Sequence, residues 1–297
     1  MTVADGALVV CPTPIGNLGD ITLRALEELR RADVAACEDT RHSRTLLHRH
    51  GIDLPLIALH EHNERAQTPA LLRRVAEGQR VCLLTDAGFP AVSDPGAWLV
   101  SEAIAAGAEL VVLPGPSAVT TALVASGMAG GGFAFAGFLP RSAGALAALL
   151  EWLDPAGLPI VAFESPRRLP ATLSRLAQRD PGRRMAVCRE LTKLHEQVER
   201  GDAASLAERF ADAPKGEVTL VLAAAEPAAQ ALPDPAGSGP DRTVVRRSVL
   251  PSCDTVGTDR HDRDTSIGDA TGRNARPCTP AAKREGYRWD DWTARSR

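Results

Sequence analysis

Short, continuous apolar runs recur through the first 113 residues and restrict the fold of this chain more than any other feature. The five runs are ALVVC (7–11), DVAAC (33–37), PLIAL (55–59), RVCLL (80–84) and ELVVL (109–113). Unbroken apolar runs of this length are typical of strands buried on both faces of a parallel sheet. Segments with a helical pattern separate them. We therefore predict an α/β unit of doubly wound character.

The segments between the runs predict the helices of this unit. ITLRALEELRRA (21–32) carries an apolar stripe at helical spacing, and helices are also expected near 44–50, 69–77 and 97–106. Asp20 is expected to cap the first of these helices and Asp94 the last, because a short acidic side chain accepts from the first free amide groups.

A second α/β unit is predicted from about residue 132 to 225. Its strand candidates are FAFAG (133–137), PIVAFE (159–164), RMAVC (184–188), EQVERG (196–201) and EVTLVLA (217–223). Helices are expected at 144–153, 169–178 and 203–210. No helix separates the third and fourth strands, which favours a mixed sheet. We place the domains at 1–127 and 132–225, with a boundary at GMAGGG.

The composition changes abruptly after residue 225. Residues 226–240 form a Pro/Ala/Gly linker, and the rest is rich in Arg, Asp, Thr and Gly, which predicts disorder over 226–297. This segment is either a natural extension or the product of a shifted reading frame.

Composition sets the expected location. The 297 residues are 44% hydrophobic and 24% charged with a net charge of −3, so a nucleic-acid partner requires a local basic patch. The six cysteines contain no C-x-x-C pair, which argues against a disulfide framework or a zinc site. The first residues show no basic segment followed by a long apolar one, so we expect no signal peptide, and no apolar run approaches the about 20 residues that span a bilayer. We expect a cytoplasmic protein.

Each apolar run of the first unit is followed by a polar loop rich in glycine, proline or charge. The loops are PTPIGNLGD (12–20), EDTRHSR (38–44), HEHNE (60–64), TDAGFPAVSDPG (85–96) and PGPSA (114–118). Ligands of open α/β sheets bind beyond the carboxyl ends of the strands, so these loops are expected to converge on one site.

Several of these loops allow two interpretations. PIGNLGD is either a tight turn or a ligand cradle containing Pro14 and Gly16. HEHNE offers possible metal ligands, but its spacing and the lack of a further partner favour no metal site. EDTRHSR is either a solvated helix start or a site that pairs phosphate with an acid. With ESPRR (164–168) and RELTKLHE (189–196), it contributes to a possible basic groove, made of Arg41, Arg44, Arg167, Arg168, Arg189 and Lys193.

The ordered motifs closely resemble those of the ribosomal RNA small subunit methyltransferase I family, a tetrapyrrole-methylase-like class. The motifs are CPTPIGNLGDITLRAL, ACEDTRHSRTLL, LHEHNE, TDAGFPAVSDPG, PGPSA, GFLPR, FESPRRL and CRELTKLHEQVERG, between residues 7 and about 223. The resemblance implies two α/β domains with S-adenosylmethionine (SAM) in the cleft between them. It also implies 2′-O-methylation of a cytidine ribose in the decoding region of 16S ribosomal RNA, within the 30S subunit, by a homodimer.

The resemblance also suggests the site residues. Asp86, Phe89, Ser117, Ala118 and Phe163 are expected to contact the cofactor, and we add Pro14, Gly16 and Gly88 as cradle residues. Phe89 and Arg167 depart from the family pattern, in which Thr and His are usual. Both changes put details of cofactor and substrate binding in question.

For catalysis we consider Glu38, Asp39 and Glu164 as the base or as orienting groups. The candidate RNA-binding residues are Arg41, His42, Arg44, Arg167, Arg168 and Lys193. Two other functions stay open: methylation of a small molecule such as a tetrapyrrole on the same fold, and SAM or RNA binding without turnover.

Overall fold

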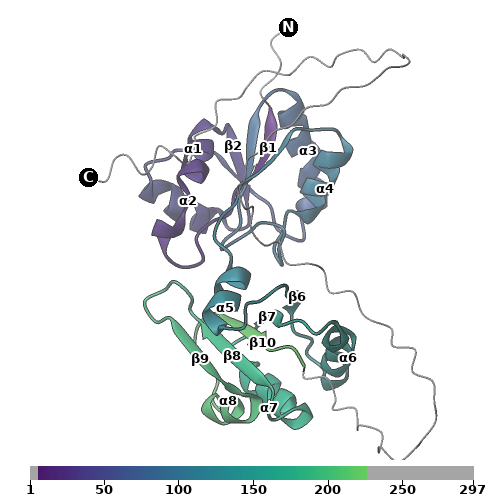
Figure 1. Ribbon diagram of the computed structural model, residues 1–297. Helices are drawn as coiled ribbons and strands as arrows, with labels where there is room; N and C mark the ends of the chain where they lie inside the picture. The colour runs from purple at the N-terminus through teal and green to yellow at the C-terminus, as the bar shows by residue number, and fades with distance from the viewer. Residues whose placement is uncertain (1–5, 226–297) are drawn as a thin grey trace, which may run out of the picture. The chain divides into compact units, whose positions relative to one another are not determined.

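Two five-stranded sheets organise residues 6–225, the part of the chain that the computed structural model describes (Figure 1). The expectations for residues 226–297 lie outside the described residues. Both sheets fall within one compact unit of the chain. The predicted fold class is confirmed: the first sheet is parallel and the second is mixed.

The first sheet has the order β3-β2-β4-β1-β5, with every pair parallel. Its strands are β1 (Ala7–Val10), β2 (Val34–Cys37), β3 (Leu56–Ala58), β4 (Arg80–Leu83) and β5 (Leu110–Val112), one within each predicted apolar run. Alternate residues of β1 enter two different hydrophobic clusters: Leu8 and Val10 one, Ala7 and Val9 the other. Burial on both faces explains why the runs are continuous.

Helices cover both faces of this sheet. They are α1 (Leu23–Arg31), α2 (Thr40–Arg49), α3 (Glu64–Ala76) and α4 (Ala97–Ala105), with a short 3₁₀ turn η1 (Leu18–Asp20) before α1. Side chains of α1 and α2 join the cluster of Ala7 and Val9, and those of α3 and α4 join the other. Helices α2 and α3 begin four and five residues earlier than predicted.

Both predicted helix caps are wrong. Thr22, not Asp20, caps α1, because its hydroxyl accepts from the amide of Ala25. Helix α4 is capped from another helix: Glu64 accepts from the amides of Gly96 and Leu99 at 3.1 and 3.0 Å. Asp94 instead accepts from the hydroxyl of Thr85.

The second sheet has the order β6-β7-β10-β8-β9. Its strands are β6 (Ala134–Phe138), β7 (Ile160–Glu164), β8 (Arg184–Arg189), β9 (Gln197–Asp202) and β10 (Val218–Leu222). Strands β6 and β7 are parallel and the other pairs are antiparallel. The associated helices are α6 (Ala143–Leu153), α7 (Leu169–Arg179) and α8 (Ala203–Arg209), with a 3₁₀ turn η2 (Asp154–Ala156) after α6.

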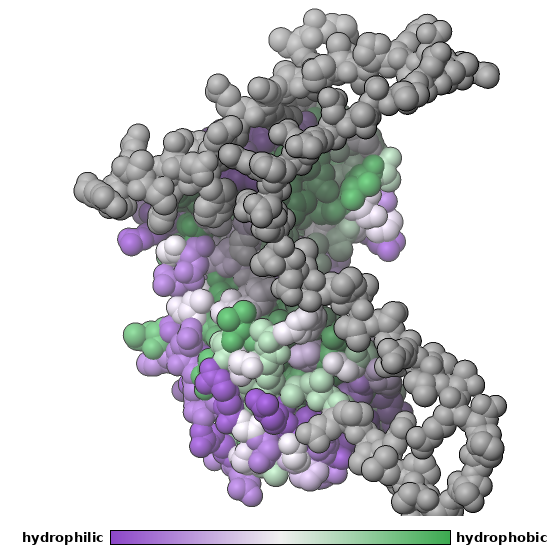
Figure 2. All heavy atoms as spheres, viewed as in Figure 1, coloured by the Kyte–Doolittle hydropathy of each residue, from purple (hydrophilic) through white to green (hydrophobic). Residues whose placement is uncertain are grey.

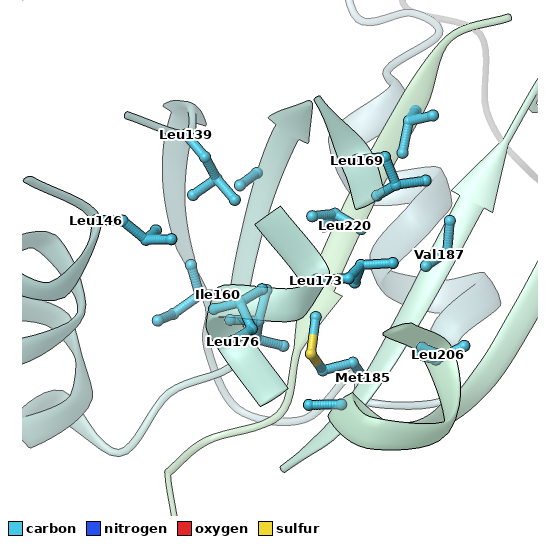
Figure 3. Close-up of a cluster of buried hydrophobic side chains, with 14 of the residues drawn as sticks. Leu139, Leu146, Ile160, Leu169, Leu173, Leu176, Met185, Val187, Leu206 and Leu220 are labelled. Atoms are coloured by element: carbon cyan, nitrogen blue, oxygen red, sulfur yellow. The ribbon is translucent and has the colours of Figure 1, made fainter. Parts of the chain in front are cut away.

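Three helices cover one face of the second sheet. In Figure 3, Leu169, Leu173 and Leu176 of α7 lie over Ile160, Leu220 and Val187 of three strands. Leu146 and Leu206 bring α6 and α8 into the same cluster. The interior of this layer is therefore a packed aliphatic core rather than a ligand cavity.

The opposite face of the second sheet is covered by α5 (Ala118–Ser126), the helix that follows the fifth strand of the first sheet. Its Val119, Ala122 and Leu123 join a cluster with Val161 and Val221. A helix that precedes the expected boundary at 127–132 thus packs on the second sheet. The domain limits remain a prediction.

The four described cysteines, Cys11, Cys37, Cys82 and Cys188, are buried free thiols. Burial raises the pKa of Cys82 to about 12 and that of Cys188 to about 11, so neither ionises near neutral pH. Hydrophilic residues are spread over the face shown in Figure 2, with groups of hydrophobic residues among them. Within residues 6–225, no helix is both long and apolar enough to cross a bilayer.

Candidate cofactor and substrate site

A pocket of about 390 Å³ opens where loops of the first sheet meet strands of the second. Its walls come from the loop after β1, the loop after β4, the start of α5, and the ends of β6, β7 and β10. The lining residues are Ile15, Ala87, Gly88, Phe89, Val92, Ser93, Asp94, Ser117, Ala118, Val119, Phe138, Phe163, Glu164, Ser165, Pro166, Gly216, Glu217, Val218 and Thr219. This volume lies within the range of ordinary small-molecule sites.

The loop after β4 is held in an unusual backbone conformation. Gly88, Ala91, Ser93 and Gly96 all have positive φ, at 82°, 68°, 66° and 118°. Two of these are not glycine, so their conformations carry strain that the surroundings must compensate. Gly88 is fixed by a bridge to Thr13, in which each amide donates to the other residue's carbonyl, at 2.8 and 3.1 Å. The loop is therefore shaped before any ligand binds.

Carboxylates gather behind and along this loop. The amide of Asp39 donates to Asp86 at 3.1 Å, and Thr85 donates to Asp94 at 2.7 Å. Burial, reinforced by Asp86, Asp94 and Asp39, raises the pKa of Glu38. Burial also raises the pKa of Asp94, partly opposed by the Thr85 hydroxyl. The group therefore favours a positively charged ligand.

Asp39 has the opposite environment from its neighbour Glu38. Hydrogen bonds from the side chain and amide of Arg41 lower the pKa of Asp39 to about 2. Asp39 also forms the N-cap of α2. A general base works best with a pKa near the operating pH, so the raised pKa of Glu38 suits that role better than the lowered pKa of Asp39. Neither residue is among those that line the pocket, and the catalytic role of both remains a prediction.

The raised pKa of Glu38 gives a testable pH dependence of stability. A carboxyl whose pKa is higher in the folded state binds more protons there, so stability falls as pH rises through the window above its unfolded pKa. We expect Glu38→Gln to raise the free energy of unfolding at about pH 7, with the gain vanishing below about pH 4, where the carboxyl is protonated in both states. Urea unfolding at both pH values measures this. A variant less stable than wild type at the higher pH contradicts it.

Glu164 reaches the pocket wall, but its carboxylate is fully occupied. It accepts from the amide of Ser165 at 2.6 Å, from the guanidinium Nε of Arg168 at 2.7 Å and from the hydroxyl of Thr172 at 2.6 Å. A second nitrogen of Arg168 pairs with it and also donates to the carbonyl of Leu139. This arrangement is suited to positioning the pocket loops, and the catalytic role of Glu164 remains a prediction.

The predicted RNA-binding residues divide into two groups. Arg41 is ion-paired with Asp39, Arg168 with Glu164, and Lys193 with Glu190 and Glu217. The other three, His42, Arg44 and Arg167, are exposed, and within residues 6–225 none has a carboxylate partner. Their assignment to RNA stays a prediction, and the two exposed arginines have charge to offer a new partner.

The structure brings five of the eight predicted cofactor residues to the pocket: Gly88, Phe89, Ser117, Ala118 and Phe163. Asp86 and Pro14 are not in the wall, and the carboxylate of Asp86 accepts from the amide of Asp39. Gly16 lies in a second groove against the loop after β8, where a Cβ would come within 2.3 Å of Lys193 Cγ. These placements do not themselves test cofactor contact.

Sequence reasoning missed the contribution of β10. Residues 216–219 line the pocket, and Glu217 also holds Lys193 at 3.1 Å. The only local signal was Gly216 before the apolar run, a residue with φ 94° that lies against Glu190. Pairing of β10 with β7 brings this segment beside Phe163.

Residues of the HEHNE segment (60–64) make hydrogen bonds that stabilise the local fold. Asn63 accepts from the amide of His60, and Glu64 caps α4. Among residues 6–225, no three His, Cys, Asp or Glu side chains are grouped so that they could hold a metal ion.

Solved structures of methyltransferases share this fold. Uroporphyrin-III-C-methyltransferase from Thermus thermophilus superposes with a TM-score of 0.52 over 73% of this chain and 94% of its own, at 22% identity. Diphthine synthase gives a TM-score of 0.59 over 73% and 90%, at 18% identity. At these identities the likeness shows the fold alone. The model of the tetrapyrrole (corrin/porphyrin) methylases matches residues 7–207.

Sequence relatives narrow the class. "Ribosomal RNA small subunit methyltransferase I" of Mesorhizobium japonicum is 48% identical over 223 residues, covering 74% of this chain and 76% of the relative. The protein of the same name from Thermotoga maritima is 41% identical over 222 residues, covering 74% and 100%. The chain therefore belongs to the ribosomal RNA small subunit methyltransferase I family, within the tetrapyrrole methylases.

Proposed function

We propose that this chain is a SAM-dependent methyltransferase that modifies the 2′-hydroxyl of a cytidine ribose in the decoding region of 16S ribosomal RNA. One observation carries the proposal. The pocket is built from loops of both sheets, and relatives named for small-subunit ribosomal RNA methylation align with both at 41–48% identity. We further propose that it acts as a cytoplasmic homodimer on the 30S subunit.

The pocket residues suit SAM. Ile15, Val119 and Phe163 supply apolar surface for an adenosine, and Ser117 makes no capping hydrogen bond to its own helix, which leaves its hydroxyl for a ligand. Asp94 and Glu217 put negative charge at the wall, where it attracts a sulfonium. When bound, SAM supplies an electrophilic methyl group.

The chain's own residues would then orient the ribose and accept the proton of its 2′-hydroxyl. The shaped loop after β4 lowers the ordering cost of binding, and fixed positioning of two reactants supplies up to roughly 7–11 kcal/mol in well-oriented systems. Glu38, with its raised pKa, is our candidate to accept the proton of the 2′-hydroxyl. Asp39 holds Arg41, and Glu164 fixes the loops through Arg168.

The test is methyl transfer from labelled SAM to 30S subunits that lack 2′-O-methyl groups. Wild type is expected to label a cytidine ribose. Loss of a general base typically costs about 10²–10⁴-fold in rate, so Glu38→Gln should lower turnover by that factor while still binding SAM. Glu27→Gln, an exposed glutamate on α1, is the matched control and should keep wild-type turnover.

Each negative result points to a different part of the proposal. No labelling of any ribose by wild type contradicts the proposed function. Labelling of a tetrapyrrole instead establishes the small-molecule alternative. Ribose labelling that survives in Glu38→Gln leaves the function intact and removes Glu38 as the base.

A further inference from the structure

Phe138 is an exposed aromatic side chain at the rim of the pocket. It is the last residue of β6, it is 59% exposed, and it lines two cavities at once. One is the pocket described above. The other is a groove of about 530 Å³, whose wall also contains Pro140, Arg141, Ser165 and Arg167. The ring thus stands where the pocket and a basic groove meet.

A bulge in β6 puts Phe138 in this position. Phe135 pairs with Val161 and Phe138 with Phe163, so three steps along β6 match two along β7. Gly137 supplies the required backbone, with φ at 63°. In a regular strand, Phe135 and Phe138 would lie on opposite faces, because side chains alternate. The extra residue turns Phe138 to the face of Phe163, with ring centroids 5.5 Å apart.

The groove beside Phe138 carries unneutralised positive charge. Arg141 and Arg167 are exposed, and within residues 6–225 neither side chain has a carboxylate partner. Arg168, in contrast, is locked between Glu164 and the carbonyl of Leu139. That lock joins the end of β6 to the start of α7, and so fixes the two segments that carry Arg141 and Arg167. An aromatic side chain that shares a groove with two arginines matches the chemistry of single-stranded RNA.

We propose that Phe138 stacks on the base of the nucleotide that is methylated, while Arg141 and Arg167 hold the neighbouring phosphates. This inference rests on the proposed function. Stacking on a ring at the rim holds an extruded nucleotide with its ribose toward the pocket. Unstacked bases are commonly bound on aromatic side chains, and phosphate contacts fix the register of the strand.

Substitutions at Phe138 test the proposal. Base–aromatic stacking is worth about 1–3 kcal/mol per base, so Phe138→Ala should lower kcat/KM for 30S subunits by about 5- to 150-fold. Phe138→Trp, which keeps the stacking face, should stay within about threefold of wild type. The affinity for SAM should change by less than about threefold in both variants. Trp152→Ala, at an exposed aromatic of α6, is the control and should leave all values unchanged.

A second measurement works without turnover. Binding of a short cytidine-containing single-stranded RNA, followed by fluorescence anisotropy, should weaken in Phe138→Ala and recover in Phe138→Trp. Arg141→Gln and Arg167→Gln should each weaken binding and reduce its salt dependence. If wild type binds RNA in this Phe138-dependent way but transfers no methyl group, the proposed function fails and the binding role stands.

Three results would overturn the role of Phe138. One is wild-type kcat/KM and RNA affinity in Phe138→Ala. Another is loss of SAM binding in that variant, which makes Phe138 a cofactor wall. The third is a fall in molecular mass by light scattering, which makes Phe138 part of a contact between copies of the chain.

Discussion

Replacing Glu164 by alanine is expected to lower the free energy of unfolding by about 3–5 kcal/mol, because it breaks an ion pair whose carboxylate is fully buried and leaves the donors around it without an acceptor. The Glu164 side chain is 0% exposed and is paired with Arg168. Its two oxygens accept from Ser165, Arg168 and Thr172, so one substitution removes the acceptor for three residues at the end of β7.

Urea unfolding followed by circular dichroism measures this loss. Glu151→Ala is the matched control: its carboxylate is 70% exposed and lies 3.6 Å from Arg179. An exposed pair contributes about 0–1 kcal/mol, so the control should differ little from wild type. Thr172→Val removes one donor to Glu164 and should cost about 1–3 kcal/mol. A Glu164→Ala protein as stable as Glu151→Ala would contradict the buried network.

The same variant separates positioning from proton transfer. If Glu164 acts by holding Arg168, then Glu164→Ala and Arg168→Ala should lose activity to a similar degree, since both break one pair. If Glu164 is itself the base, Arg168→Ala should retain much more turnover than Glu164→Ala. If Glu164 is the base, the pH profile of kcat should also change in Glu164→Ala and not in Arg168→Ala.

The strands of the first sheet could be predicted because both of their faces are buried, which makes consecutive residues apolar. Leu8 and Val9 face different helices yet are both apolar, so the ALVVC run identifies a strand covered on both sides. Loop positions followed from the same strands, and Gly88, Ser117 and Ala118 line the pocket as the parallel topology requires. These signals are local and need no knowledge of distant partners.

The features that sequence reasoning missed depend on contacts between distant residues. Glu64 caps α4 from 32 positions away, which no local pattern indicates. The β6 bulge appears only when the register with β7 is known, and the predicted strand, 133–137, ends one residue before Phe138. Glu38 and Asp39 are neighbouring acids with opposite pKa shifts. Hydrogen bonds from Arg41 lower the pKa of Asp39, whereas burial and then the nearby carboxylates raise the pKa of Glu38.

Replacing Ala118 by tryptophan is expected to abolish cofactor binding while leaving the protein folded. Ala118 is the first residue of α5 and lies in the pocket wall beside Ser117 and Val119. Its methyl group is only partly buried and packs against the cluster under α5, and the side of the residue that lines the pocket is where a larger side chain has room. An indole there occupies the volume that an adenosine requires.

Overpacking typically costs 1–3 kcal/mol or more, and each 1.4 kcal/mol is tenfold in affinity, so we expect Ala118→Trp to bind SAM about 100-fold more weakly or not measurably. Isothermal titration calorimetry measures the affinity, and Ala118→Val should give an intermediate loss. Ala105→Trp, at the exposed end of α4, is the control for adding an indole to a helix terminus. If Ala118→Trp unfolds with wild-type stability and binds SAM with wild-type affinity, this pocket does not hold the cofactor. If it loses SAM binding but keeps its stability, the wall formed by α5 belongs to the cofactor site, and the effect of Phe138 can then be attributed to the RNA.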